Sequence, residues 1–405
     1  MKIRSITYFC NPRWPLDLKK LRAAGDFLAE AKAAFEQAGY EVQSVRLATT
    51  PFPMLLGKDK LSETPRLAEQ LGRLLPELGI GYAALGPAQP SLPGSYPVIP
   101  EAIAASQNIF FSAVMAEARH GISMAAVKAC AQIIVRTSTL EPNGFANLNF
   151  AALANVPPGS PFFPAAYHVG VSPSFAIATE AADLAVQAFS SAGTLAEARQ
   201  NLITLMERHA GALTGIADAL SNRFGVTFSG IDYSLAPFPS QLLSLGHALE
   251  LLGVPGLGRH GSLAAAAFLA DTMDRAQFSR AGFSGLFLPL LEDAVLAQRA
   301  AEGLLSLTDL LLYSAVCGTG LDTVPLPGDA SPEQLAAVLL DVAALSSRLE
   351  KPLTARLMPV PGKRAGDPTG FDFAFFANSR VLDLKAAPLS GLLRGDDTLA
   401  LRRRP

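Results

Sequence analysis

The chain has 405 residues, 50% of them hydrophobic and 17% charged, and this composition is typical of a globular protein with a substantial buried core. The formal net charge of -2 leaves no basic surplus for phosphate backbones and excludes nucleic-acid binding driven by electrostatics. Three scattered cysteines form neither a disulfide framework nor a zinc motif, so we expect a protein of the reducing cytoplasm. The apolar runs are shorter than the roughly 18 residues of a spanning helix, so no membrane association is predicted.

Strand and helix patterns alternate from the first residue onward. Apolar alternation predicts a strand over 2–9, and a helical pattern over 18–39 ends at a glycine. Further strands are predicted at 41–47, 80–85, 109–115, 224–237, 286–291, 321–327 and 355–360. Ser123 is expected to cap the helix that follows the third of these. Strands that are apolar on both faces and separated by helices are typical of a sheet covered by helices, so an α/β fold is predicted.

Two uncharged segments interrupt this alternation. Residues 142–179 contain no Asp, Glu, Lys or Arg, and their Asn, Pro and Gly recur too often for a membrane span. We expect interior strands there, together with a loop that folds over another part of the molecule. Residues 78–100 are also uncharged and rich in Pro and Gly, which predicts a long ordered loop that serves as a lid or as a dimer contact.

Asp232 is the sharpest candidate for a functional residue. It lies inside the strand pattern VTFSGIDYSLAP and is the only Asp, Glu, Lys or Arg between Phe224 and Leu249. A carboxylate among apolar residues needs a partner, a metal or a proton, because desolvating it alone is costly. Asp232 is therefore either part of a site or a structural carboxylate that binds neighbouring backbone. Ser234, at the end of the same strand, is a candidate substrate contact.

Polar residues also follow other predicted strands, where sites in α/β folds gather. Asn155 and His168 follow one strand, and His168 lies in a Gly-bearing turn, which favours a catalytic role. Glu292 and Asp293 follow another strand. With Asp232 they form a candidate site for a divalent cation, because hard cations bind clustered carboxylates. The alternative is that both are first-turn acids that favour a helix dipole.

The stretch GLGRHGSLAAAAF contains the spacing G-x-G-x-x-G. No strand precedes it, so neither a nicotinamide nor a flavin cofactor is predicted. A glycine-rich turn that enters a helix at Ser262 can still bind a carboxylate or phosphate, with Arg259 and His260 beside it. Ordinary helix capping by Ser262 with a solvated Arg259 is the alternative. Arg356, in a predicted strand, is a second candidate for anion binding or for an ordinary ion pair.

A catalytic role for a cysteine is the last possibility that the sequence raises. Cys317 ends a predicted helix, where the negative end of the dipole raises a thiol pKa, so a structural role is favoured. Cys10 ends the first strand but lacks a local activator. Asp322 is expected to serve the turn between the helix and the next strand.

Seven stretches together carry a family resemblance: HGISMAAVKACAQII, FFPAAYHVGV, GVTFSGIDYSLAPFPS, GRHGSLAAAAFLAD, GFSGLFLPLLED, AVCGTGLDTVPLPGD and ARLMPVPGK. In order, they resemble the bacterial and archaeal family known as domain of unknown function seven hundred and eleven. The resemblance implies one domain over 1–405, a ten-stranded α/β barrel similar to that of pyruvate formate-lyase-like glycyl radical enzymes, and a homodimer. In such a barrel, two sets of parallel strands run antiparallel to each other around a central site. The carboxyl-terminal segment has no glycyl-radical motif, so radical chemistry is not expected.

These observations lead to one main expectation and two alternatives. We expect an enzyme in which Asp232, His168 and His260 perform acid/base or cation-assisted chemistry on a small polar metabolite. The metabolite's carboxylate or phosphate would bind at the turn over 259–262. The alternatives are a non-catalytic small-molecule sensor and a purely structural dimer. Convergence of the three residues around one cavity would favour the enzyme or the sensor.

Overall fold

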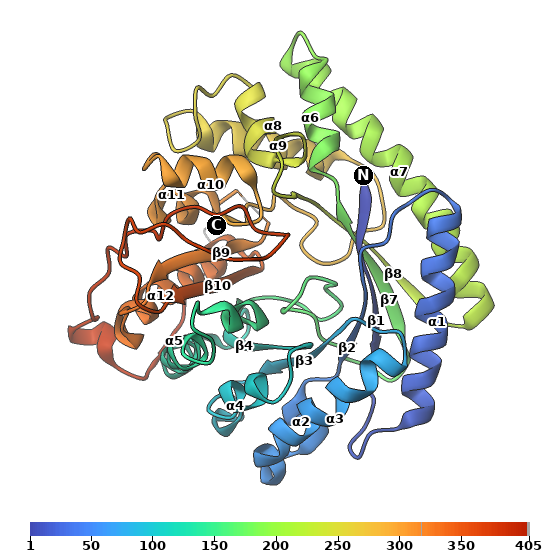
Figure 1. Ribbon diagram of the computed structural model, residues 1–405, viewed down its shortest axis with the longest axis vertical. Coiled ribbons are helices and arrows are strands. Elements are labelled where there is room, and N and C mark those ends of the chain that lie inside the picture. The colour runs from blue at the N-terminus through green and yellow to red at the C-terminus, as the bar shows by residue number, and fades with distance from the viewer. Residues whose placement is uncertain (317, 403–405) are drawn as a thin grey trace.

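One large curved sheet organises the part of the chain that the computed structural model describes, residues 1–316 and 318–402 (Figure 1). Helices lie along the outer side of the curve, and irregular segments lie within it. Among these residues the fold is therefore a mixed α/β fold, as the alternating patterns predict. No helix in this part of the chain is long and apolar enough to cross a membrane.

Nine strands follow one another across the sheet in the order β8–β7–β1–β2–β3–β4–β6–β10–β9. Their bounds are β1 Lys2–Cys10, β2 Val45–Thr49, β3 Tyr82–Ala88, β4 Ile109–Glu117, β6 Phe150–Ala154, β7 Ser174–Glu180, β8 Thr227–Ala236, β9 Gly320–Pro327 and β10 Leu353–Val360. Two short strands, β5 (Gly121–Ser123) and β11 (Thr398–Leu399), extend the sheet beside β4.

The strands form two sets that run in opposite directions. β1, β2, β3, β4 and β6 are parallel to one another. β7 and β8 are parallel to each other and β7 is antiparallel to β1, while β10 and β9 are parallel to each other and β10 is antiparallel to β6. The continuous ladder ends at β8 and β9, so backbone hydrogen bonds among the described residues do not close the sheet into a barrel.

The segment 279–291 lies between these two edge strands and forms an isolated parallel bridge, between Arg280 and Ile231 of β8, without forming a strand. Ile231 N donates to Ser279 O at 2.8 Å on one side, and Leu290 N donates to Asp322 O at 3.1 Å on the other. The strand predicted at 286–291 is therefore not formed. Apolar composition alone does not distinguish a ladder strand from a buried irregular segment, which is why the pattern misleads here.

Twelve α-helices surround the sheet in the described part of the chain. They are α1 Leu18–Gln37, α2 Phe52–Leu56, α3 Thr64–Glu77, α4 Ile99–Ala104, α5 Met124–Ser138, α6 Ala182–Ser190, α7 Leu195–Phe224, α8 Leu245–Leu251, α9 Ser262–Arg275, α10 Ala294–Ala301, α11 Leu307–Tyr313 and α12 Pro332–Leu349. Short 3₁₀ helices are η1 Lys58–Glu63, η2 Pro93–Ser95, η3 Phe145–Asn149, η4 Gln241–Leu243 and η5 Gly391–Arg394.

Local sequence signals set several of these bounds. The Asp17 side chain accepts hydrogen bonds from the backbone of Lys19 and Lys20 and so begins α1. Ser123 caps α5 by accepting from Ala126 N, as predicted. The segment 78–100 is not one long loop, because it contains β3 and the start of α4. Gly86 and Pro87 of this segment lie in β3 at a register shift that ends at Pro87, where such residues are tolerated.

The uncharged loop that leaves β6 fills part of the space inside the curve (Figure 1). Phe163 and Ala166 of this loop pack in one buried cluster with small and aromatic residues of five strands, namely Phe9, Ala48, Ala84, Phe110 and Ala176. Alanines on the inner face leave room for the loop, because their side chains end at Cβ. The expectation that 142–179 combines interior strands with a covering loop is therefore confirmed.

Candidate functional site

A cavity of about 380 Å³ lies on the inner side of the sheet, within the lower part of the size range of ligand sites. Its wall comes from many elements: the amino ends of β1 and β2, the carboxyl ends of β7 and β8, β10, and the loop at 161–163. Five charged side chains line it, Arg4, Arg46, Asp232, Glu292 and Arg356. Concave sites with a few convergent polar groups are the usual form of small-molecule sites.

The opposite directions of the two strand sets explain why these residues meet. β7 is antiparallel to β1, with Lys2 opposite Glu180, so the carboxyl end of β7 lies beside the amino end of β1. β8 follows β7 in parallel, and Asp232 is the partner of Ala178. Asp232 and Ser234 near the carboxyl end of β8 therefore lie at the same end of the curved sheet (its mouth) as the side chains from the beginning of β1 and β2.

Asp232 is held by the turn at 282–284. Ser284 N donates to its Oδ1 at 2.9 Å, Phe283 N donates to its Oδ2 at 3.1 Å, and the Ser234 hydroxyl also donates to Oδ1. The residue is 2% exposed, and burial raises the pKa of its carboxyl while these hydrogen bonds lower it in part. From the described residues, Oδ2 accepts only one hydrogen bond, so it keeps capacity for a proton or a ligand.

This raised pKa predicts a specific pH dependence of stability. The folded chain retains the Asp232 proton to higher pH than the unfolded chain, so protonation favours the folded state at low pH, and this advantage disappears as the pH rises through the folded pKa. We expect the free energy of unfolding of wild type to fall relative to Asp232→Asn as the pH rises above about 4. Urea unfolding of both proteins across a pH series measures this difference. A difference independent of pH would contradict proton uptake by Asp232.

Four charged residues form a buried chain of ion pairs at the edge of the cavity. Arg356 binds Asp322 through Nε–Oδ1 at 2.5 Å and Nη2–Oδ2 at 2.7 Å, and it reaches Glu292 Oε1 at 3.0 Å. Arg4 pairs with the other oxygen of Glu292. Burial raises the pKa of Asp322 to about 6 against the opposing effect of Arg356. Burial alone would lower the pKa of Arg356, but Asp322 and Glu292 outweigh it and raise that pKa.

The ion-pair interpretation of Arg356 is thus confirmed, and Asp322 has a different role from the one predicted. It lies in β9 and is fully buried beside Arg356, rather than serving a turn. The ion pair between Arg356 and Asp322 could not be predicted from local sequence patterns, because the two residues lie 34 positions apart on neighbouring strands.

Arg46, which the sequence analysis missed, is the most available cation of the cavity. Its Nε donates to Ser44 Oγ at 2.9 Å, and its guanidinium lies over the Phe163 ring at 5.1 Å from the centroid. Within 1–316 and 318–402, no carboxylate lies within ion-pair distance of it. Burial and repulsion from Arg4 lower its pKa to about 9, and a bound anion would offset both effects. The sequence signal that identified Asp232, a charged residue within a predicted strand, is also present at Arg46 and could have identified it.

His168 lies at the opposite end (the other mouth) of the curved sheet, where β2 ends. Its backbone N donates to Thr49 O at 2.9 Å, at the carboxyl end of β2, and its Nε2 lies 3.1 Å from Gly170 O. Burial lowers its pKa. Asn155 follows β6 at the same mouth and donates to Ser346 Oγ at 2.9 Å. Neither residue lines the cavity that contains Asp232.

The turn at 259–262 also lies apart from the cavity. Arg259 and His260 are exposed before α9, and neither lines it. Gly261, rather than Ser262, is the capping residue of α9. Ser262 is buried, and its hydroxyl donates to Arg259 O at 2.7 Å. Asp232, His168 and His260 therefore do not converge around one cavity.

The three carboxylates considered as ligands of a divalent cation, Asp232, Glu292 and Asp293, each bind other groups of the protein. Both Asp293 oxygens accept hydrogen bonds, from the backbone of Val295 and Leu296 at the start of α10, from Gly246 N and from the Ser244 hydroxyl. Glu292 is bound to two arginines. Within the residues that the structure describes, no group of three or more His, Cys, Asp or Glu is arranged to hold a metal.

The cysteines offer no nucleophile in the described chain. Cys10 is buried, and burial raises its pKa to about 12, so its thiol stays protonated at neutral pH. Cys130 is also buried and its pKa is raised for the same reason. Cys317 lies outside the described residues.

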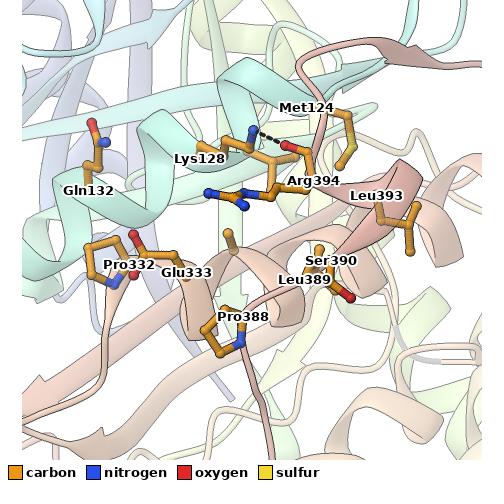
Figure 2. A pocket seen from close by; sticks show the side chains of 12 residues that line it. Met124, Lys128, Gln132, Pro332, Glu333, Pro388, Leu389, Ser390, Leu393 and Arg394 are labelled. Atoms are coloured by element: carbon orange, nitrogen blue, oxygen red, sulfur yellow. Dashed lines mark hydrogen bonds between the residues drawn. The ribbon is translucent and has the colours of Figure 1, made fainter.

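Two larger hollows lie on the outer side, under the carboxyl-terminal segment. One, of about 560 Å³, runs between α5 and α12 and is covered by residues 388–394 (Figure 2). Lys128 lines it, but its ammonium already donates to Arg394 O at 2.6 Å and Gly395 O at 2.9 Å. The other, of about 610 Å³, lies beside residues 380–389. The Lys128 ammonium thus holds the chain's own backbone, unlike the Arg46 guanidinium.

Fold and site together define an α/β protein whose curved sheet encloses a small, arginine-containing cavity. Residues 1–374 match the family described as "Uncharacterised ACR (DUF711)", and the chain belongs to this family. It is 34% identical over 366 residues to a UPF0210 protein of Pyrobaculum aerophilum, covering 86% of this chain and 79% of the relative. A UPF0210 protein of Desulforudis audaxviator is 32% identical over 372 residues, covering 86% and 81%. One of Desulforamulus reducens is 30% identical over 423 residues, covering 96% and 91%.

Proposed function

We propose that the chain is an enzyme that performs non-radical acid/base chemistry on a small metabolite bearing a carboxylate or a phosphate. One observation carries the proposal: a cation without a carboxylate partner among the described residues, Arg46, lines the same cavity as a buried carboxyl with a raised pKa, Asp232. The first group binds and orients an anion. The second exchanges a proton with the bound molecule.

The chemistry follows from the surroundings of each group. Arg46 presents a planar, charged set of donors, which suits bidentate binding of a carboxylate or phosphate. A carboxyl whose pKa is moved toward neutrality can act as a general acid when protonated and as a general base when ionised. The hydrogen bonds from Phe283 N and Ser284 N hold Asp232 in one orientation, so its carboxyl loses little side-chain freedom during reaction.

The buried ion pairs have a supporting role in this proposal. Arg4 and Arg356 share Glu292, so their charges are largely compensated before any ligand arrives. The chain of pairs keeps this part of the wall rigid, because each member has fixed partners. Arg356 is thus a positioning residue for the wall of the cavity, and Arg46 is the anion-binding residue.

The same proposal includes kinship with the ten-stranded barrel of pyruvate formate-lyase-like enzymes. Two antiparallel sets of strands and the segment 279–291 between β8 and β9 support it. The homodimer implied by the resemblance stays a prediction. A non-catalytic sensor is the second candidate, supported by the same cavity, and turnover separates the two.

A metabolite-depletion experiment tests the proposal. Wild type, Asp232→Asn, Arg46→Met and the matched control Arg73→Met are incubated with a mixture of small carboxylates and phosphates, and consumption is followed by mass spectrometry. Arg73 suits the control because its side chain is 77% exposed on α3. We expect one compound to be consumed by wild type and the control. Asp232→Asn should bind it, as seen by native mass spectrometry, with turnover lowered at least about 100-fold.

Each variant has its own contrary result. Retained turnover in Asp232→Asn would remove this residue from the chemistry. Unchanged binding of the compound by Arg46→Met would show that Arg46 is not the anion-binding residue. Binding by wild type without turnover of any compound would establish the sensor instead.

A further inference from the structure

Aromatic rings form an unusual share of the cavity wall. Eight aromatic residues line it, Tyr82, Phe110, Phe145, Phe162, Phe163, Phe287, Phe373 and Phe375. They come from widely separated parts of the chain, including β3, β4, η3, the loop at 161–163 and the segment that follows β10. A wall of this kind presents flat apolar surface to whatever occupies the cavity.

Six of the rings form two contacting groups, and Phe162 and Phe287 form a separate pair with centroids 5.4 Å apart. Phe110 lies edge-on to both Tyr82 and Phe163, with centroids 5.6 and 5.5 Å apart. Phe373 contacts Phe145 at 5.1 Å and Phe375 at 5.3 Å. In the second group all three rings are half-buried, so they retain accessible surface on the cavity side. Tyr82 is 41% exposed. The two groups are therefore not fully covered by the protein itself.

The free cation lies against the first group. The Arg46 guanidinium lies over Phe163, so an anion bound to Arg46 is held beside an aromatic face. An acidic group and an apolar ring in one small ligand match this juxtaposition. The volume of about 380 Å³ limits the ligand to a compact molecule.

The polar side chains of the wall argue against a polyhydroxylated ligand. Gln43 Nε2 donates to Glu180 at 2.6 Å, and Asn149 Nδ2 donates to Ile109 O at 3.2 Å. Arg4, Glu292 and Arg356 are bound to one another. Hydroxyl groups of a sugar phosphate that lie against these paired side chains or against the rings would be buried without partners, and such burial is costly. An aromatic ring has no such requirement.

We propose that the cavity binds a small aromatic carboxylic acid, with its carboxylate on Arg46 and its ring against the phenylalanines. This proposal rests on the anion site of the proposed function and specifies its substrate class. Stacked and edge-to-face ring contacts favour an aromatic ring over a saturated ring of the same size. The cavity should therefore discriminate between two acids that differ only in the aromaticity of the ring.

Calorimetric titration with four probes tests the ligand class: phenylacetate, cyclohexylacetate, malonate and inorganic phosphate. We expect phenylacetate to bind wild type about threefold to tenfold more tightly than cyclohexylacetate. Arg46→Met should weaken phenylacetate at least about tenfold, and Arg46→Lys should retain part of the affinity. Phe373→Leu should weaken phenylacetate and leave malonate unchanged. Phe268→Leu, on α9 outside the cavity, is the matched control and should bind as wild type does.

The outcomes separate the two proposals. Malonate or phosphate binding that depends on Arg46, without binding of phenylacetate, would overturn the aromatic class and keep the anion site. Equal affinity for the two ring acids would also overturn the aromatic class. Failure of all four probes to bind folded wild type would overturn the aromatic class and the Arg46 anion site together. Circular dichroism of each variant confirms that the fold is present.

Discussion

Replacing Arg356 by methionine is expected to lower the free energy of unfolding by about 3–5 kcal/mol. The change leaves the carboxylate of Asp322, which is fully buried, without the two hydrogen bonds that Arg356 donates. It also removes one of the two arginines that compensate Glu292. Urea unfolding at neutral pH measures the loss.

An exposed ion pair provides the control for this variant. Arg73 pairs with Glu69 one turn earlier in α3, and both side chains are largely solvated. Arg73→Met should cost about 0.5 kcal/mol or less. Adding Asp322→Asn to Arg356→Met should restore part of the stability, because it removes the uncompensated charge. Equal losses for Arg356→Met and Arg73→Met would show that the buried chain of ion pairs does not support the fold.

Replacing Gly282 by alanine is expected to damage both the fold and the site. Gly282 has a φ of +59°, and a Cβ built on it would lie 2.1 Å from Asp232 Oδ2, so the carboxylate must move. We expect a loss of about 1–2 kcal/mol from the backbone conformation and about 1–3 kcal/mol more from the contact. Thermal unfolding gives the stability, and titration with the consumed metabolite gives the binding.

Gly39→Ala is the control that measures the loss of stability from the backbone conformation alone. Gly39 has a φ of +87° and nothing within 4 Å of a built Cβ, so Gly39→Ala reports the conformation alone. The double variant Gly282→Ala/Asp232→Ala should recover the part of the loss that comes from the contact. If the two glycine variants lose the same stability, the turn does not fit tightly around Asp232.

Local signals were sufficient for much of the fold. Ser123 was predicted to cap α5 because a capping side chain and its helix are neighbours in sequence. The strand around Asp232 was predicted because apolar residues surround it on both sides. The strand expected at 286–291 was wrong because apolar composition shows that a segment is buried and does not show whether it pairs with a neighbouring strand.

The site depended on long-range information that the sequence does not show. The rule that sites gather at carboxyl ends of strands was applied as if all strands ran in one direction. In the structure β2 and β8 run in opposite directions, so the carboxyl end of β2 near His168 and that of β8 near Asp232 lie at opposite mouths. Arg4 and Glu292 meet across 288 positions, which no local pattern predicts.

The wide spread of the cavity wall along the chain has a consequence for how the protein is made. Arg4 leaves the ribosome 371 residues before Phe375, yet both line the cavity. At synthesis rates of about 5–20 residues per second, roughly 20–75 s separate their appearance. During that time the nascent β1 lacks its neighbour β7 and Arg4 lacks Glu292, so the growing amino-terminal half exposes an unpaired strand edge. We therefore expect chaperone contact to be concentrated on the amino-terminal half, and the ability to bind a ligand to arise only after the segment with Phe375 has been made.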